Sequence, residues 1–241
     1  MNDERGTMNR NHLTPTPLRQ RRAAALALWR LRAPMLAFEW DAEWGLDRTV
    51  VDELFRSAVS APDEQSDGRY RRAAAELSRA PLFDSEVDDP NVRELVQLET
   101  LVRLLAFGEA RAEPTEDQNE DQSEDQADDQ AEDQVEFIVE GPRDLAHYVD
   151  QCVEASFYDH PSQDAHRQYL AALPAPARNH GLGYLASRNL AVEHACHETL
   201  PALPASDGLL DTPAGRDLIA RCEDFGAELA ATLKWLGTTG R

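Results

Sequence analysis

An acidic four-residue repeat in the middle of the chain sets the strongest limit on how the chain can fold. Between Glu113 and Glu140 there are thirteen Asp and Glu residues and no Lys or Arg, arranged around the units EDQN, EDQS, EDQA, DDQA and EDQV. In a helix this spacing would place like charges one turn apart and leave no apolar face for packing. Such a segment cannot bury enough surface to offset the entropy lost on ordering. The sequence therefore predicts a disordered acidic insert over residues 111–136.

The insert also accounts for most of the acidity of the chain. The 241 residues carry a formal charge of −21, and the acidic tract supplies thirteen of these negative charges, which leaves −8 for the rest. A chain this acidic lacks the basic face that nucleic-acid binding needs, so we expect no nucleic-acid partner. We interpret the insert as a solvated spacer. The alternative is an electrostatic tether for a basic partner or for arginine-rich surfaces of the chain itself.

On both sides of the insert, apolar residues recur every three or four positions, which is the period of an amphipathic helix. The expected helices cover approximately 16–44, 47–59, 67–79, 90–110, 141–157, 161–173, 178–200 and 212–236. No second strand is evident to pair with the alternating run at 135–140, which we expect to be extended or to lengthen a helix. The sequence thus predicts an all-α bundle of about eight helices.

The domain organisation follows from these segments. We expect a disordered N-terminal arm over 1–15, a helical part over 16–110, the acidic insert over 111–136, and a second helical part over 137–241 that packs on the first. The fourth helix is apolar around most of its circumference, which is typical of the central helix of a bundle. Pro34 is expected to kink or interrupt the first helix, and Gly141 with Pro142 to begin the fifth.

The cysteines and the lengths of the apolar runs indicate the cellular compartment of the protein. The three cysteines, Cys152, Cys196 and Cys222, lie at apolar positions of predicted helices without paired spacing. They are therefore interpreted as small buried side chains in a reducing compartment. No apolar run near the N-terminus is long enough to span a membrane. We expect a cytoplasmic protein without a membrane partner.

One run of residues has the composition of a metal site. Within Glu193–Glu198, one helical turn separates His194 from both His197 and Glu198, and also separates Glu193 from His197. Two imidazoles and two carboxylates on adjoining faces have the chemistry that Zn²⁺ or iron requires. Further ligands would come from His147, His160, His166 or His180. The alternative is two partly exposed histidines beside acidic neighbours, and because no established metal motif is present we expect no cofactor.

A second run combines aromatic and acidic residues. Trp40 and Trp44 would stack one turn apart on a helix, with Glu39 and Glu43 beside them. Aromatic rings flanked by carboxylates can bind a basic or methylated partner through cation–π contacts. The alternative is that the two tryptophans anchor their helix in the core.

The order of the elements over residues 24–173 resembles the YjaG-like family of helical bacterial proteins. The resemblance rests on Pro34 followed by Phe38, on Trp44-Gly45-x-Asp47 at the start of a helix, on Ala80-Pro-Leu-Phe-Asp84 before a long apolar helix, and on Gln168. The spacing from Pro34 to Gly45 is one residue shorter than in the family pattern, and the acidic repeat and the last seventy residues fall outside it. The resemblance implies a helical fold and no known activity.

Two classes of function are therefore open. The first is a non-enzymatic protein-interaction module, such as an immunity- or antitoxin-like inhibitor or a regulatory adaptor, that binds a partner through an acidic helical surface, for which a basic partner is the complement. The second is a helical metalloprotein or metal-dependent enzyme centred on His194 and His197. The sequence contains no phosphate-binding glycine loop, nucleophile elbow or Cys-x-x-Cys motif, which favours the first class. A homodimer is an open alternative.

Overall fold

A computed structural model of the chain describes residues 17–110, 124–159, 164 and 183–239. The α-helices in these ranges are α1 (Pro17–Leu36), α2 (Arg48–Val59), α3 (Glu64–Leu77), α4 (Val92–Glu109), α5 (Glu124–Asp159), α7 (Tyr184–Thr199) and α8 (Pro213–Thr239). Short 3₁₀ turns lie at η1 (Ala42–Trp44), η2 (Pro81–Asp84) and η5 (Leu200–Ala202). Since the described residues contain helices and no strand, the predicted all-α fold is confirmed.

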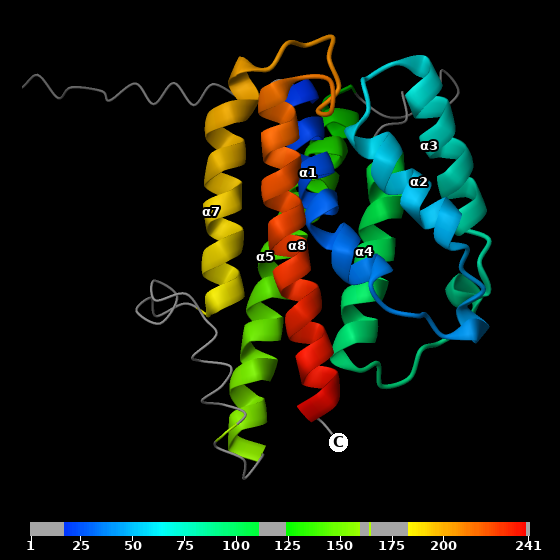
Figure 1. The fold of residues 1–241 in the computed structure, drawn as a ribbon. Coiled ribbons are helices and arrows are strands. Elements are labelled where there is room, and N and C mark those ends of the chain that lie inside the picture. The colour runs from blue at the N-terminus through cyan, green and yellow to red at the C-terminus, as the bar shows by residue number, and fades with distance from the viewer. Residues whose placement is uncertain (1–16, 111–123, 160–163, 165–182, 240–241) are drawn as a thin grey trace, which may run out of the picture.

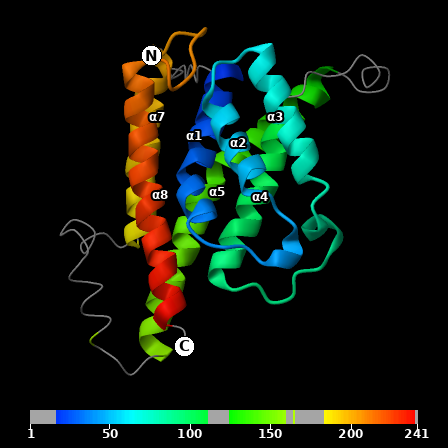
Figure 2. The same ribbon diagram turned by 45° about the vertical axis from the view of Figure 1, so that its right-hand side comes forward.

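The helix at the centre of the fold is α1. It contacts α2, α4, α5, α7 and α8, and every residue from Ala24 to Leu31 is buried. On one side, α5, α7 and α8 complete a four-helix bundle with it, while α2, α3 and α4 pack on the other side (Figures 1 and 2). The expectation that the fourth helix would be central is wrong. Val102 in α4 is 47% exposed, so one apolar face of that helix reaches the surface.

The last turns of α1 cross the middle of α8 closely. α1 ends at Leu36, eight residues before the expected end, because Pro34 lies in its last turn and has no N–H to offer the carbonyl of Arg30. That carbonyl faces Gly226 of α8, where a Cβ atom would lie only 2.7 Å from its oxygen. The crossing therefore depends on a proline in one helix and a glycine in the other.

Side-chain caps fix the first residues of α2, α3 and α4, the helices that pack on the other side of α1 from α8. Asp47 accepts a hydrogen bond from the backbone N–H of Thr49 and begins α2, as the sequence predicts. α3 begins three residues earlier than expected because Asp63, and not Asp67, caps it. Asn91 and Glu94 form a capping box at the start of α4.

Helix α5 differs most from the sequence-based expectation. It begins at Glu124, so residues 124–136 of the expected disordered insert are helical, while 111–123 lie outside the described residues. Ile138 is fully buried, and helix propagates from such a packed segment at little further cost. The run at 135–140 thus lengthens a helix, and Gly141 and Pro142 lie inside it instead of starting it.

A contact with α4 explains why glycine occurs at position 141. The buried side chain of Arg103 crosses α5 at Gly141 and would collide with any Cβ atom there. The expected helix at 161–173 lies outside the described residues, apart from Asp164. α7 begins at Tyr184, and residues 178–182, which were expected to belong to it, also lie outside the described part. None of the described helices combines the length and hydropathy that crossing a membrane needs.

Candidate functional site

A network of charged and polar side chains, centred on the buried Arg30 and Asn189, joins α1, α5 and α7. The side chain of Arg30 in α1 is 2% exposed and donates hydrogen bonds to the side chains of Asn189 and Glu193 in α7. Arg143 in α5 donates to the second carboxylate oxygen of Glu193 at 2.9 Å, and Asn189 donates to the first, also at 2.9 Å. Glu193 therefore lies between two guanidinium groups, and its hydrogen-bonding capacity is used inside the protein.

The charges around Glu193 determine its protonation. Burial acts to raise the pKa of this carboxyl, but the hydrogen bond from Arg143 and the positive charges of Arg30 and Arg143 outweigh it, so the net pKa lies below its ordinary value. The carboxylate is therefore ionised at neutral pH. It neutralises Arg30, which would otherwise be an isolated charge in the core.

The predicted metal ligands are not brought together. His194 and Glu198 lie on the exposed face of α7, with 3.8 Å between Nδ1 and the carboxylate, and His197 is also exposed. Glu193 instead binds Arg30 and Arg143. Among the described residues no group of three His, Cys, Asp or Glu side chains is arranged to hold a metal ion. Of the other candidates, His147 contacts Gln151, whereas His160, His166 and His180 lie outside the described residues.

This arrangement gives a prediction for metal content. Because Glu193 is bound to two arginines and His194 has only a surface carboxylate beside it, we expect less than one tenth of an equivalent of zinc or iron in the purified protein. Elemental analysis after gel filtration measures this. One equivalent that disappears in a His194→Ala/His197→Ala variant would contradict the prediction and restore the metalloprotein alternative.

Two thiols adjoin the same network. Cys196 in α7 and Cys222 in α8 are buried and free. A hydrogen bond from the thiol of Cys222, assisted by the charge of Arg30, lowers the pKa of Cys196, whereas the same hydrogen bond and burial raise the pKa of Cys222. Both residues are buried as the sequence predicts, while Cys152 is only half-buried.

The predicted aromatic and acidic site lies in a loop and not on a helix. Because α1 ends at Leu36, Trp40 and Trp44 do not stack one turn apart. Trp44 is buried in the core at η1, while Trp40 is half-buried and its indole N–H donates to the carbonyl of Met35 at 3.0 Å. The core alternative therefore holds for Trp44 and in part for Trp40, which packs against the core with one side and reaches the surface with the other.

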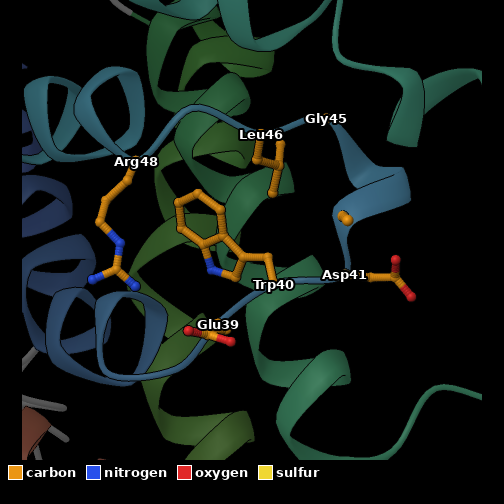
Figure 3. Close-up of a pocket in the computed structure, with 7 residues that line it drawn as sticks. Glu39, Trp40, Asp41, Gly45, Leu46 and Arg48 are labelled. Carbon is orange, nitrogen blue, oxygen red and sulfur yellow. The ribbon is translucent and has the colours of Figure 1, made fainter.

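Trp40 forms part of a shallow surface pocket of about 300 Å³. Figure 3 shows its ring between Leu46 and the side chain of Arg48, with Glu39 and Asp41 at the edge of the pocket. The guanidinium of Arg48 lies 5.7 Å from the centre of the indole ring and also donates to the carbonyl of Phe38 at 3.0 Å. The ring thus already takes part in one cation–π contact.

Two acidic residues, Glu39 and Asp41, line this pocket, and Glu43 follows in the same loop. Glu39, Asp41 and Glu43 are all exposed, and we call this group together with Trp40 the acidic loop. Asp41 also accepts a hydrogen bond from the backbone N–H of Glu43 at 2.9 Å, which caps η1. Gly45 ends η1 with φ +62° and packs so closely on Pro81 of η2 that a Cβ atom would lie 2.5 Å from the proline ring. The acidic loop is therefore fixed to the rest of the fold.

The arginines of α1 do not form a free basic surface. Arg22 and Arg30 are buried, and Arg22 donates to backbone carbonyls of Leu203, Pro204 and Asp207. Arg21 pairs with Asp67 in α3, and Arg32 pairs with Asp52 in α2 at 2.6 Å. These side chains hold helices together, so they are poorly placed to bind the chain's own acidic insert.

The sequence reasoning missed the network around Arg30. The sequence feature that could have indicated this network is an arginine inside a long apolar run, with the apolar residues Trp29 and Leu31 on both sides, which are buried in the fold. Asn189 and Glu193 are separated by one helical turn, which is the spacing that lets both reach the same guanidinium. The resemblance motifs around Gly45 and Pro81 contact each other in the fold, which their distance in sequence does not reveal.

The comparisons with known proteins supply no relative from which a function could be inferred. No protein-family model matches this chain, and neither the curated proteins nor the solved structures that were compared yield a similar protein.

Proposed function

We propose that this protein is a non-enzymatic interaction module that binds an arginine- or lysine-bearing segment of a partner protein on its acidic loop. An inhibitor of the immunity or antitoxin kind and a regulatory adaptor both fall within this description. The resemblance to the YjaG-like family remains a prediction and adds no activity to the proposal.

The observation that carries the proposal is the position of Trp40. Its indole N–H is anchored by Met35, its ring borders the pocket, and two exposed acidic residues, Glu39 and Asp41, also line that pocket, with Glu43 two residues further along the loop. An aromatic face fixed in place beside negative charge is the arrangement that binds a guanidinium or an ammonium group. The existing contact with Arg48 supports the proposal, because it places a guanidinium beside the same ring.

The overall charge supports the same type of partner. With −21 on the chain, the field around the molecule attracts basic proteins and repels acidic ones. Such a field mainly speeds association, while close contacts at the pocket determine how long the complex lasts. We therefore assign specificity to the acidic loop and long-range attraction to the acidic tract.

A direct test is the affinity for a basic probe peptide. We expect a fluorescein-labelled (Arg-Ala)₅ peptide to bind the full chain in fluorescence anisotropy, and the same peptide with citrulline in place of arginine to bind at least tenfold more weakly. A Trp40→Ala variant and a Glu39→Gln/Asp41→Asn/Glu43→Gln variant should each lose about tenfold in affinity, which corresponds to about 1.4 kcal/mol. Asparagine at position 41 can still cap η1, so the loop should keep its fold.

The matched control removes the same number of charges from the acidic tract. A Glu116→Gln/Asp117→Asn/Glu120→Gln variant changes the net charge equally, and we expect it to reduce the affinity less than threefold. If this control loses as much affinity as the acidic-loop variant, the tract and not the loop binds the peptide. The proposal is then refuted in favour of a nonspecific electrostatic tether.

A further inference from the structure

A second and larger pocket lies where three helices end. It has a volume of about 650 Å³ and is bordered by Phe38 after α1, by Val92 and Arg93 at the start of α4, and by Leu233, Lys234 and Leu236 near the end of α8. Pockets that hold small ligands are typically about 300–1,000 Å³. Its size is therefore that of a ligand site.

The charge of this pocket is opposite to that of the chain. Within the described part of the chain, its charged lining residues are Arg93 and Lys234, both positive, and no Asp or Glu lines it. Lys234 is the only lysine in the sequence, and among the described residues no carboxylate pairs with it. Glu94 approaches Arg93 at 3.7 Å, but Glu94 is also bound to the backbone N–H of Asn91 in the capping box. An anionic group is the complement that such a lining favours.

Polar atoms near the pocket have unused hydrogen-bonding capacity. The Nε of Arg93 is buried and has no hydrogen-bond partner among the described residues, while its guanidinium lies 5.6 Å from the centre of the Phe38 ring. Gln97, one turn later in α4, is 1% exposed and also lacks a partner for its amide within the described residues, but it does not line the pocket. Buried polar atoms without partners are uncommon in native proteins, and an absent ligand is one explanation for them.

We infer that this pocket binds an amphipathic carboxylate, that is, a small molecule with a carboxylate head and an aliphatic tail. The head would be held between Arg93 and Lys234, and the tail would lie along Phe38, Leu233 and Leu236. Arginine binds a carboxylate through two parallel N–H donors, and a lysine adds a second positive charge. This inference concerns a different pocket from the acidic loop and does not depend on the proposed function.

The experiment compares three ligands with the same ten-carbon tail on the full chain. We expect saturable binding of decanoate in isothermal titration calorimetry, at concentrations below its micelle range. Decanol should bind at least tenfold more weakly because it lacks the charge, and decyltrimethylammonium should not bind this pocket. Equal binding of decanoate and decanol, or no saturable binding of decanoate, would overturn the inference.

Variants locate the site. An Arg93→Gln/Lys234→Gln variant should weaken decanoate binding at least tenfold, whereas Arg71→Gln/Arg72→Gln, which removes the same charge from the exposed face of α3, should change it less than twofold. Equal losses in the two variants would show that the net charge and not the pocket is responsible, which also refutes the inference. Because the three-ligand comparison uses the unmodified chain, it decides the matter even if the first variant fails to fold.

Discussion

Replacing Glu193 by alanine is expected to lower the free energy of unfolding by about 3–5 kcal/mol, the range for removing one partner of a buried ion pair. Arg30 is 2% exposed, and without Glu193 its charge would be left in the core with only Asn189 and a backbone carbonyl as acceptors. Urea unfolding followed by circular dichroism at 222 nm measures the effect. This is the largest single-residue effect that we expect outside the apolar core.

Two further variants distinguish the stability cost of an unpaired buried charge from the cost of lost packing contacts. Arg143 is 53% exposed at its side chain, so Arg143→Ala should cost no more than about 1 kcal/mol. An Arg30→Met/Glu193→Leu double variant removes both buried charges and should recover most of the stability lost in Glu193→Ala. A double variant as unstable as Glu193→Ala would show that shape, and not an unpaired charge, determines the cost.

The same network predicts a dependence of stability on pH. The pKa of Glu193 is lower in the folded state than in the unfolded state, so its contribution is fully present above the unfolded pKa of about 4.3. The contribution is lost as the pH falls through the lower folded pKa. We therefore expect the stability difference between the natural chain and Glu193→Gln to shrink below about pH 4.

Replacing Gly226 by alanine is expected to have the second largest effect. Overpacking should lower the free energy of unfolding by about 1–3 kcal/mol. The added Cβ would lie 2.7 Å from the carbonyl oxygen of Arg30 and 3.2 Å from Ala33, so α1 and α8 would have to separate. Both contacts belong to a helix backbone or its first side-chain atom, which cannot move aside cheaply. Thermal and urea unfolding measure the loss.

The same helix offers a control at Gly237. A Cβ there meets nothing within 4 Å, so Gly237→Ala should raise the free energy of unfolding by up to about 1 kcal/mol through helix propensity alone. A loss of stability in Gly226→Ala together with a gain in Gly237→Ala would support the close crossing of α1 and α8. If Gly226→Ala stabilises the protein as Gly237→Ala does, the two helices do not cross as closely as described.

The helical periods of the sequence predict the fold class well, because the burial of an apolar stripe depends on residues that are close in the chain. α2 and α8 begin at the capping residues that the sequence indicates, Asp47 and Thr212. The sequence misplaces the end of α1 because aromatic residues after Pro34 continue the apolar pattern. It also misplaces the start of α5, because a strand-like alternation and a Gly-Pro pair normally mark a boundary and here lie inside a helix packed on Arg103.

The candidate sites are harder to predict, since they depend on contacts between distant segments. The run Glu193–Glu198 has the composition of a metal site, yet the partners of Glu193 come from residues about 160 and 50 positions away in sequence. The sequence indicates the aromatic and acidic run. That Trp44 is buried while Trp40 reaches the surface, however, follows only from the turn of the chain after Leu36. The pocket at Arg93 and Lys234 joins segments that no sequence pattern connects.

The most direct test of the proposed function follows the indole N–H and backbone signals of the ¹⁵N-labelled chain while the (Arg-Ala)₅ peptide is added. The proposal predicts chemical shift changes centred on the indole of Trp40 and the amides of Glu39, Asp41 and Glu43, while the indole of Trp29, which is buried and donates to Glu223, stays unchanged. Changes confined to the acidic tract, or an unaffected Trp40 indole at saturating peptide, would contradict it.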